Sequence, residues 1–520
     1  MTWLFVLAAV LAILVVLAVI DVIQTRHAIR RNYPVIGRLR YALERLGPEL
    51  RQYIVTDNDE ERPFSRDQRR WVYTSAKLEN QYFGFGTDNK MTAPLYPIFR
   101  QSAFPYSPAA DRRLDTGQSL DAGASPETAD RAANYLPPTK ILGEWRDRPG
   151  AFRPQSMVAI SAMSFGSLSG RAIESLNRGA AIAGCLHNTG EGGVSAHHLH
   201  GGELIFQLGT GYFGARTPGG GFDLDAAIAL VDRSPIRAIE VKLSQGAKPG
   251  LGGVLPAAKV TAEIAAARGV PVGVTVASPA RHAEFGTVAE MIDFVERIAD
   301  ACRVPVGIKS AVGDLSFWVE LAEEMASTGR GPDFISIDGG EGGTGAAPLV
   351  FSDHVSLPFR FGFAEVYRIF AERSMHDKVM WFGAGRLGFP GEAMVAVALG
   401  ADMIYVAREA MMAIGCIQAQ ECHTGHCPTG VATHSKWLTR GLDPTDKSAR
   451  AANYLMSFRG ELIKLAHAFG KPHPALVSGR AVDLMMDGES ITSLWDHFNY
   501  RDEWQAVPDE HESYMAKLMS

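Results

Sequence analysis

An alternation that begins at Met157 constrains this chain more than any other feature. Short β-branched or apolar runs alternate there with Ala-rich stretches of helical length, which predicts βα units around a parallel sheet. The candidate strands are Met157–Ser161, Gly184–Asn188, Leu204–Leu208, Ala238–Leu243, Pro271–Val276, Val304–Lys309, Asp333–Asp338, Val379–Phe382 and Asp402–Val406. Nine runs are one more than a (β/α)8 barrel needs, so we treat Leu204–Leu208 as an accessory strand. The span is roughly 250 residues, the usual size of one such barrel. The predicted fold is therefore an α/β TIM barrel.

Composition supports a globular protein and excludes one large class of function. Apolar residues make up 46% of the 520 residues and charged residues 21%, which leaves no room for a largely disordered chain. With 51 Lys and Arg against 57 Asp and Glu, the formal net charge is −6. This charge excludes a nucleic-acid binder that depends on a basic surface.

The N-terminus predicts a membrane anchor over residues 1–24. The run Trp3–Ile20 has no charge and, at about 1.5 Å per residue, would extend roughly 27 Å, enough to cross a bilayer core. A cleaved signal peptide would need basic residues before the run and a small-residue cleavage site after it, and neither is present. A buried core helix is the remaining alternative. The arginines that follow the run predict an outside N-terminus and a cytoplasmic remainder: Arg26, Arg30, Arg31, Arg38, Arg40 and Arg45. Residues 25–154 form the next predicted segment, which includes a polar loop at Ser107–Thr128.

Glycine-bearing loops follow five of the predicted strands. Barrel active sites are built from the loops at the carboxyl ends of the strands, and glycine lets backbone N–H groups approach a phosphate closely. Together the loops predict a phosphate-bearing cofactor. They are Ser161–Gly170, Asn188–Gly193, Ser244–Gly253, Asp338–Pro348 and Gly383–Gly388.

Three cysteines form the sharpest local motif. Cys416, Cys422 and Cys427 have the spacing C-x5-C-x4-C and are followed by a proline. Zinc would need a fourth ligand, which His423 or His426 could supply. An iron–sulfur cluster would need only thiolates, and a proline after the last cysteine is frequent in ferredoxin-type runs. The spacing alone leaves both interpretations open.

These motifs together amount to a family resemblance. The stretches SAMSFGSLS, NTGEGG, EVKLSQGAKPG, DGGEGGTGA and GCIQAQECHTGHCPTGVATH occur in the order seen in the FMN-binding synthase domain of glutamate synthases, and the chain resembles the short stand-alone members most. The match covers residues 155–435 and leaves 436–520 as a predicted C-terminal helical extension. The resemblance implies a barrel that carries FMN and a [3Fe–4S] cluster, with Cys416, Cys422 and Cys427 as the cluster ligands. It implies structural roles for His423 and His426.

The resemblance also implies the site residues. Lys248 and Arg268 match the family's 2-oxoglutarate-binding cations, Gln245 matches the glutamine ahead of that lysine, and Glu191 matches the active-site glutamate that orients ammonia or stabilises an iminium. For Lys309 two roles stay open, a contact to the flavin's N1–C2=O edge and an ion pair within the barrel, and the second is open for Lys242 too. Gly383, Gly385, Ala407 and Arg408 are expected at the phosphate. The other predicted cofactor contacts are Ser161, Ala162, Met163, Ser164, Asn188, Lys242, Asp338, Gly339 and Gly340.

Departures from the family pattern bear on the reaction. Val254 replaces a family glutamine and Gly313 replaces a family glutamate that helps to gate ammonia delivery. The chain starts Met1-Thr2-Trp3, so we expect no N-terminal cysteine nucleophile and no glutamine hydrolysis by this chain. Nitrogen would then come from ammonia, an amine or a separate amidotransferase partner. Electrons would come from a donor protein or a quinone-linked partner. A homo-oligomer stays open.

The predicted function is reductive amination of 2-oxoglutarate, or a related 2-oxo acid, by a membrane-anchored oxidoreductase, with glutamate as the product from 2-oxoglutarate. One alternative is N-methylglutamate synthase-like transfer, in which an amine replaces ammonia. The other is a membrane-tethered electron-transfer module without amination activity.

Overall fold

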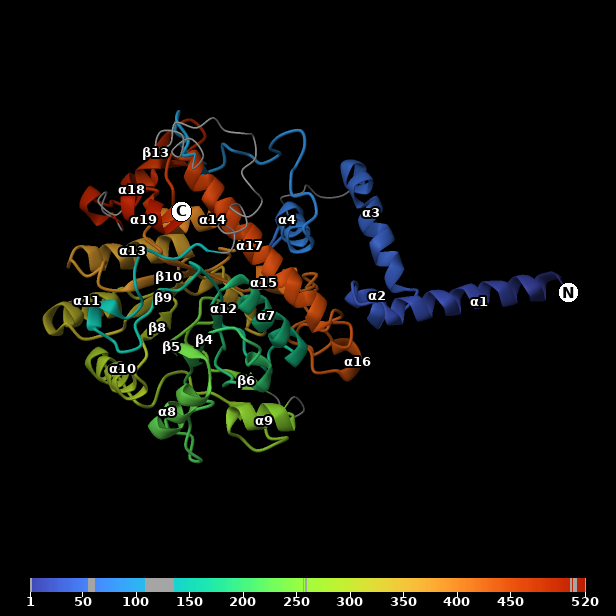
Figure 1. Cartoon of the computed structure of the whole chain (residues 1–520), viewed down its shortest axis with the longest axis horizontal. Coiled ribbons are helices and arrows are strands. Elements are labelled where there is room, and N and C mark those ends of the chain that lie inside the picture. The colour runs from blue at the N-terminus through green and yellow to red at the C-terminus, as the bar shows by residue number, and fades with distance from the viewer. Residues whose placement is uncertain are drawn as a thin grey trace.

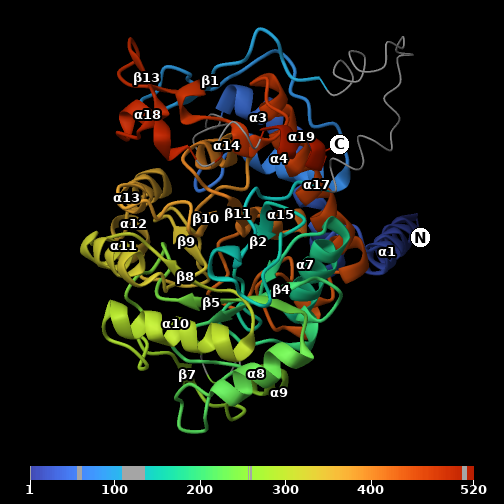
Figure 2. The same ribbon diagram turned by 60° about the vertical axis from the view of Figure 1, so that its left-hand side comes forward.

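Eight parallel strands close into a barrel in the order β10-β11-β2-β3-β4-β5-β8-β9. The computed structural model describes residues 2–54, 61–107, 135–255, 257, 260–505, 507 and 512–519, so nearly all of the predicted Ser107–Thr128 loop lies outside the described residues. Figure 2 shows the barrel with helices around it. The predicted fold class is confirmed. The barrel strands are β2 (Val158–Ile160), β3 (His187–Asn188), β4 (Leu204–Leu208), β5 (Ile236–Lys242), β8 (Val306–Ser310), β9 (Phe334–Asp338), β10 (Met380–Ala384) and β11 (Met403–Val406).

Two of the nine strand predictions were wrong. Leu204–Leu208 is not an accessory strand but the barrel strand β4, and all five of its residues are buried. Pro271–Val276 is not a barrel strand. Val272 and Val274 in this stretch are 60% and 50% exposed, and a short antiparallel pair outside the barrel is made by β6 (Val254–Leu255) and β7 (Val276–Ala277). A run of alternating apolar residues whose side chains face solvent cannot line a barrel buried on both faces.

The helices that surround the barrel have ordinary start signals and apolar faces. The Thr287 hydroxyl and the Glu290 side chain form a capping box at the start of α10. Buried residues recur along α10 at helical spacing: Val288, Met291, Ile292, Val295, Ile298, Ala299 and Cys302. The helices of the barrel region are α7 (Gly170–Ala183), α8 (Leu224–Arg233), α9 (Ala262–Arg268), α10 (Val288–Cys302), α11 (Ser316–Thr328), α12 (Leu349–His354), α13 (Phe359–Ala371), α14 (Pro390–Ala398) and α15 (Arg408–Ala413).

A buried carboxylate joins four strands inside the barrel. Glu240 on β5 is fully buried and accepts hydrogen bonds from Asn188 Nδ2 (2.8 Å), Gln207 Nε2 (2.7 Å), Ser336 Oγ (2.7 Å) and the Tyr405 hydroxyl (3.1 Å). Those donors come from β3, β4, β9 and β11. A buried charge costs little only when donors satisfy it in this way.

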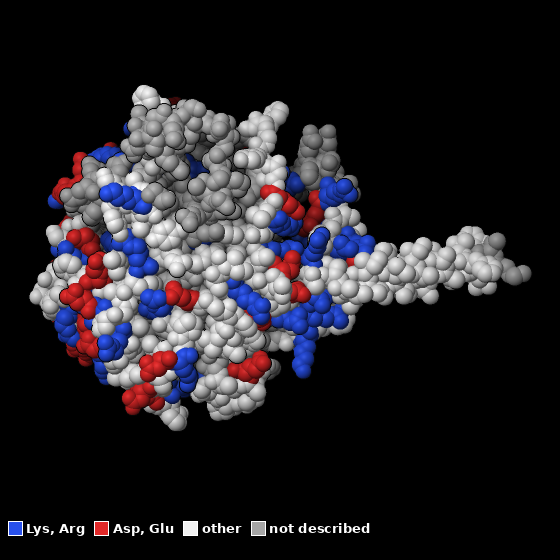
Figure 3. Space-filling view, in the orientation of Figure 1, with Lys and Arg blue, Asp and Glu red and all other residues white. Residues whose placement is uncertain are grey.

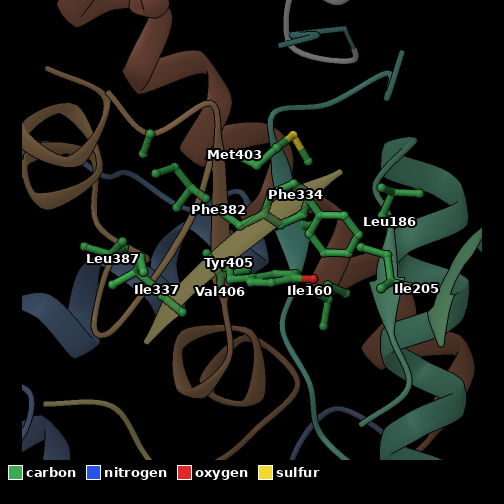
Figure 4. Close-up of a cluster of buried hydrophobic side chains, with 14 of the residues drawn as sticks. Ile160, Leu186, Ile205, Phe334, Ile337, Phe382, Leu387, Met403, Tyr405 and Val406 are labelled. Carbon is green, nitrogen blue, oxygen red and sulfur yellow. The ribbon is translucent and has the colours of Figure 1, made fainter. Parts of the chain in front are cut away.

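The aromatic core of the barrel surrounds the Tyr405 ring. Figure 4 shows Tyr405 close to Phe334 and Phe382, whose ring centroids lie 4.9 Å apart. The Phe382 and Tyr405 centroids lie 5.1 Å apart. A Cβ on Gly307 would lie 2.4 Å from the Phe334 ring, so this strand position accepts no side chain.

Segments on both sides of the barrel in sequence pack against it and against each other. The long helix α17 packs along α7 and α4, and β1, β12 and β13 form an antiparallel sheet. The C-terminal segment predicted as helical therefore also contributes two strands. These elements are α4 (Arg66–Lys77), β1 (Pro97–Phe99), α16 (Lys436–Thr439), α17 (Pro444–Ala468), β12 (Val482–Met485), β13 (Ile491–Ser493), α18 (Leu494–His497) and α19 (Glu512–Met519).

The apolar N-terminal run is one helix that projects from the body. Figure 1 shows α1 (Thr2–Ile23) extending away from the barrel, with α2 (Ala28–Asn32) at its base and α3 (Gly37–Ile54) turning off crosswise. The stretch Trp3–Ile23 has a mean hydropathy of 3.2, and none of its most apolar window is buried. The alternative of a buried core helix therefore does not describe this structure.

Candidate active site

A cavity of about 540 Å³ lies at the carboxyl ends of the barrel strands. It is lined by residues from β4, β5, β8, β9, β10 and β11 and from the segments that follow β2, β5, β9, β10 and β11, which is where barrel enzymes bind their ligands. The lining residues are Ser161, Ala162, Gln207, Lys242, Gln245, Lys309, Asp338, Gly342, Gly343, Ala384, Gly385, Arg386, Tyr405, Ala407, Arg408 and Glu409.

The structure brings eight of the fourteen predicted cofactor residues to this cavity: Ser161, Ala162, Lys242, Lys309, Asp338, Gly385, Ala407 and Arg408. The other six do not line it: Met163, Ser164, Asn188, Gly339, Gly340 and Gly383. Asn188 faces the buried Glu240, and the glycines serve close packing. A Cβ on Gly383 would lie 2.8 Å from the Phe359 ring, and one on Gly339 would lie 2.6 Å from the Phe359 Cβ.

Two arginines lie where the barrel's last two strands end. The Arg408 Nη2 donates to the Glu341 carbonyl at 2.6 Å, and burial lowers the pKa of Arg408. Arg386 and Arg408 both lie over the ring of Phe64, at 5.4 and 4.9 Å from its centroid. The segment before α4 therefore covers this end of the cavity, and the two cations make it suitable for an anion.

Lysines provide the positive charge on the neighbouring strands β5 and β8. Lys309 is nearly buried, with its Nζ 3.5 Å from Asp338 Oδ2 and 5.8 Å from the centroid of the Tyr405 ring. Asp338 Oδ2 also accepts from the Gly246 amide at 3.0 Å. The loop after β5 is thereby fixed against the end of β9.

A second cavity adjoins the first and shares two of its residues. Lys242 and Gln245 lie on the walls of both. The smaller cavity encloses about 300 Å³ and is lined by Glu191, Thr210, Lys242, Leu243, Ser244, Gln245, Lys248, Gly250, Leu251, Gly252, Gly253, Pro279 and Ala280. Three of the four predicted substrate residues, Glu191, Gln245 and Lys248, thus surround one space.

Lys242 contacts two other side chains of the smaller cavity. Its Nζ lies 3.0 Å from Glu191 Oε1 and donates to Gln245 Oε1 at 2.7 Å. Burial alone would raise the pKa of Glu191, but Lys242, and more weakly Lys248 and Arg268, hold that pKa below its ordinary value. Burial and the charge on Lys242 lower the pKa of Lys248, although Glu191 opposes the shift. The small cavity is therefore a positively charged space with one ionised carboxylate on its wall.

Arg268 does not line either cavity. It ends α9, its Nη2 donates to the Phe165 carbonyl at 3.5 Å, and its guanidinium lies 4.9 Å from the Phe213 ring centroid. Burial lowers the pKa of Arg268, and the charge of Glu191 partly offsets the shift. Its Nε is buried without a hydrogen-bond partner. In this structure Arg268 supports Glu191 electrostatically from outside the cavity.

The three motif cysteines lie in the segment after α15. Cys427 is buried, while Cys416 and Cys422 are half-buried. Burial, reinforced by the neighbouring Cys427 and Cys422, raises the pKa of Cys416 to about 12. Among the described residues, no three His, Cys, Asp or Glu side chains could hold one metal ion. The Tyr73 hydroxyl of α4 donates to the Cys416 carbonyl at 2.9 Å and helps to fix the segment.

Sequence reasoning missed Gln207, Tyr405 and Arg386 on the cavity wall. Gln207 and Tyr405 lie inside ordinary strand patterns, and nothing local marks them. Arg386 lies between two glycines of the predicted phosphate-binding loop Gly383–Gly388. Its positive charge in that loop could have identified it as a cofactor contact.

A family model and several sequence relatives indicate one family for this chain. Residues 146–472 match the model of the conserved region in glutamate synthase. The chain is 38% identical over 488 residues to a glutamate synthase large subunit-like protein, YerD, of Bacillus subtilis, covering 91% of this chain and 92% of that protein. It is 36% identical to the archaeal-type glutamate synthase [NADPH] of Thermotoga neapolitana, over 60% of this chain and 59% of that one. It is 34% identical to the ferredoxin-dependent glutamate synthase of Cyanidium caldarium, over 53% of this chain and 18% of that one.

Proposed function

The chain belongs to the glutamate synthase family and is a glutamate synthase-like oxidoreductase, and on that premise we propose that it reductively aminates 2-oxoglutarate or a related 2-oxo acid. FMN would occupy the larger cavity and the 2-oxo acid the smaller one. Electrons would arrive from a partner by way of a [3Fe–4S] cluster at the cysteine segment.

The residues of the larger cavity fit FMN. It lies at the carboxyl ends of the barrel strands, and its walls carry four cationic side chains, those of Lys242, Lys309, Arg386 and Arg408. Arg386 and Arg408 would hold the phosphate beside Gly342, Gly343 and Gly385. A Cβ on Gly343 would lie 2.6 Å from Arg408 Cδ, and Gly385 has a φ of +129°, so side chains at these positions would close the loops or strain them. FMN, when bound, supplies a pair of electrons as hydride.

Lys309 and Lys242 would contact the part of the same cavity that lies away from the two arginines. Lys309 is nearly buried and paired with Asp338, so its ammonium stays in a fixed position. A fixed cation stabilises negative charge that develops nearby without the cost of reorienting solvent. Lys242 lies between the two cavities, and it would orient the 2-oxo acid beside the reducing group while keeping Glu191 ionised.

The smaller cavity suits a substrate that carries a carboxylate and whose 2-oxo group is converted to a positively charged iminium. Lys248 and Lys242 supply positive charge for a carboxylate, and Lys248 has no ion-pair partner among the described residues within 4.0 Å. The ionised Glu191 would orient ammonia and stabilise the iminium formed from the 2-oxo group. The family role of Arg268 in binding a carboxylate stays a prediction, since its side chain would have to turn from Phe165 into the cavity.

The cluster proposal for the cysteine segment rests on the family match, which includes this segment. The thiols of a [3Fe–4S] cluster bind separate irons and so lie farther apart than the ligands of a single ion. Because burial raises the thiol pKa values of Cys416 and Cys422, metal binding would be needed to deprotonate them.

We propose that the membrane anchor brings the chain close to its electron donor. Helix α1 is long and apolar enough to cross a bilayer, with the arginines after it on the cytoplasmic side. The names of two relatives specify NADPH and ferredoxin as donors, so donors differ within the family. For this chain we propose a donor protein or a quinone-linked partner at the membrane. A separate amidotransferase and a homo-oligomer remain predictions.

One observation supports the amination proposal most strongly: Lys242 lies on both cavities and touches both Glu191 and Gln245. The test is to reduce the purified full chain anaerobically, add 2-oxoglutarate with or without ammonia, and follow flavin absorbance. We expect reoxidation only when both are present, with glutamate as the product. Reoxidation with methylamine but not ammonia would favour the amine-transfer alternative. No response to any 2-oxo acid, amine or amino acid would favour an electron-transfer module.

A further inference from the structure

A charged joint holds the base of α1 in a fixed direction. Asp21 at the end of α1 is fully buried and pairs with Arg30 and Arg38, each at 2.8 Å, and its Oδ2 accepts from the Val35 amide at 3.1 Å. These bonds tie α1 to α2 and to the first turn of α3. The angle between α1 and α3 is therefore set by two ion pairs to one buried carboxylate rather than by a loose linker.

The same joint is bonded to the cysteine segment. Asn32 Nδ2 donates to the carbonyl of Pro428, the residue after Cys427, at 3.0 Å, and to that of Leu438 at 2.8 Å. Lys447 Nζ and Arg450 Nη2 both donate to the Arg26 carbonyl, at 3.1 and 2.9 Å. The direction of α1 is thus fixed relative to the cysteine segment and to the start of α17.

The first half of helix α3 exposes apolar side chains. Leu39 and Leu43 lie one helical turn apart and are 61% and 53% exposed, and Ile36 just before the helix is 77% exposed. In sequence, Leu46 and Leu50 continue the same spacing. Arg40 and Glu44 pair with each other on a different side of the helix. Figure 1 shows α3 running crosswise to α1, as a helix in a membrane surface runs crosswise to one that spans it.

Cationic and aromatic side chains surround the base of α1. Figure 3 shows Lys and Arg gathered where the uncharged rod of α1 leaves the body. Tyr33 and Trp437 are 41% and 51% exposed there, and the Trp437 ring centroid lies 3.1 Å from the Arg440 guanidinium carbon. Tyrosine and tryptophan prefer the level of lipid headgroups, and arginines attract anionic lipid.

We propose that α3 lies flat in the surface of an anionic bilayer that α1 crosses, and that this second contact turns the cysteine segment toward the lipid. The inference rests on the proposed anchorage by α1. The occupant of the α3 face is lipid because that face adjoins a helix of membrane length and is surrounded by positive charge and headgroup-level aromatics. A second copy of this chain would have to bring the same arginines together.

The test places a photoreactive amino acid at single positions of the full chain in vesicles of phosphatidylcholine and phosphatidylglycerol. We expect lipid adducts from positions 39 and 43, as from position 11 within α1. Position 44 on another side of α3 and position 491 on β13, where Ile491 is 53% exposed, are the matched controls and should give none. Adducts at 11 but not at 39 or 43 would overturn the proposal and leave the anchor intact. No adducts at position 11 would overturn the anchorage itself, and crosslinks between two chains at 39 or 43 would identify a second copy as the occupant.

A variant provides an independent measurement. The double change Leu39→Glu and Leu43→Glu should leave the chain in the membrane fraction, since α1 is unchanged. It should increase the rate of tryptic cleavage at Arg40 and Arg45 in vesicles by about tenfold or more, because the helix would no longer be covered by lipid. Ile491→Glu is the control and should leave cleavage unchanged. Equal cleavage rates in wild type and double variant would contradict the proposal.

Discussion

Replacing Lys242 with methionine removes the ammonium that lies on the walls of both cavities. Methionine keeps most of the length of the side chain, so the change removes charge more than volume. Glu191 would lose a partner at 3.0 Å and Gln245 a donor at 2.7 Å. The side chains of Lys242 and Glu191 are 11% and 23% exposed, so water can replace little of the lost interaction.

The size of the effect follows from the pair's geometry. Two unit charges at this separation attract by about 5 kcal/mol at an effective dielectric constant of about 20. Burying the lysine ammonium offsets roughly half of that gain, and Lys248 and Arg268 continue to favour the ionised Glu191. We expect a net loss of about 2–3 kcal/mol in the free energy of unfolding, together with a rise in the pKa of Glu191.

The pH dependence has a definite sign. In the wild type the pKa of Glu191 lies below its ordinary value, so the stabilisation is present above the unfolded pKa and is lost as pH falls through the folded one. The difference in stability between wild type and Lys242→Met should therefore be largest at neutral pH and shrink in acid. The assay is thermal unfolding of the FMN-loaded full chain in detergent from acid to neutral pH. At neutral pH we expect the melting temperature to fall by about 2–3 °C, because the unfolding entropy of a chain of this length is about 1.1 kcal/mol/K. In the variant, the fall of turnover on the acid side should begin at a higher pH than in the wild type, because the pKa of Glu191 rises.

Two variants complete the experiment. Adding Glu191→Gln to Lys242→Met should restore much of the lost stability but not turnover, because the carboxylate that lost its nearest cation is then replaced by a neutral amide. Arg237→Met removes an arginine that pairs with Glu203 at a more exposed site and should cost less than about 0.5 kcal/mol. A Lys242→Met variant that is as stable as the wild type at neutral pH, with an unchanged acid limb, would refute the idea that this pair controls Glu191.

The remaining predictions concern the cofactors, the substrate site and the anchor. Cys422→Ser should abolish the near-isotropic EPR signal of an oxidised [3Fe–4S] cluster and leave FMN bound, whereas one zinc and no iron in the wild type would sink the cluster proposal. Arg408→Met should weaken FMN binding by about 10- to 100-fold in fluorescence titration, since a charge-assisted bond to phosphate contributes about 1.5–3 kcal/mol. Glu191→Gln should still show a flavin spectral change on adding 2-oxoglutarate, but steady-state glutamate formation should fall about 100-fold or more. Deleting residues 2–24 should move flavin-loaded protein to the soluble fraction, and retention in membranes would locate the main attachment elsewhere.

Local patterns predicted the barrel well where strands are buried and well separated. β5, β8, β9, β10 and β11 all occur within the predicted runs or within two residues of them. Local patterns failed for Leu204–Leu208 and Pro271–Val276, because the first was predicted to lie outside the barrel and the second inside it, and the structure has the reverse. Both runs are apolar and flanked by turn residues, and only closure of the barrel determines which one is buried.

For the candidate site, too, the sequence predicted the residues but not the contacts between them. Glu191, Lys242, Gln245 and Lys248 come from contiguous motifs, so their types and order could be interpreted from the amino-acid sequence alone. The bridge that Lys242 makes between Glu191 and Gln245 could not, because β3 and β5 are brought together by β4 between them. Tyr405 is another such case, since it reaches the cavity only because β11 pairs with β2.

The four bonds to Glu240 have a consequence for how the chain folds. Its donors Asn188 and Gln207 lie 52 and 33 residues away in sequence, whereas Ser336 and Tyr405 lie 96 and 165 residues away. A half-barrel that ends after β5 would bury this carboxylate with only half its donors, which disfavours a stable half and delays closure until β11 has been made. Fragments cut between β5 and β8 should therefore stay unfolded alone and acquire structure only when mixed.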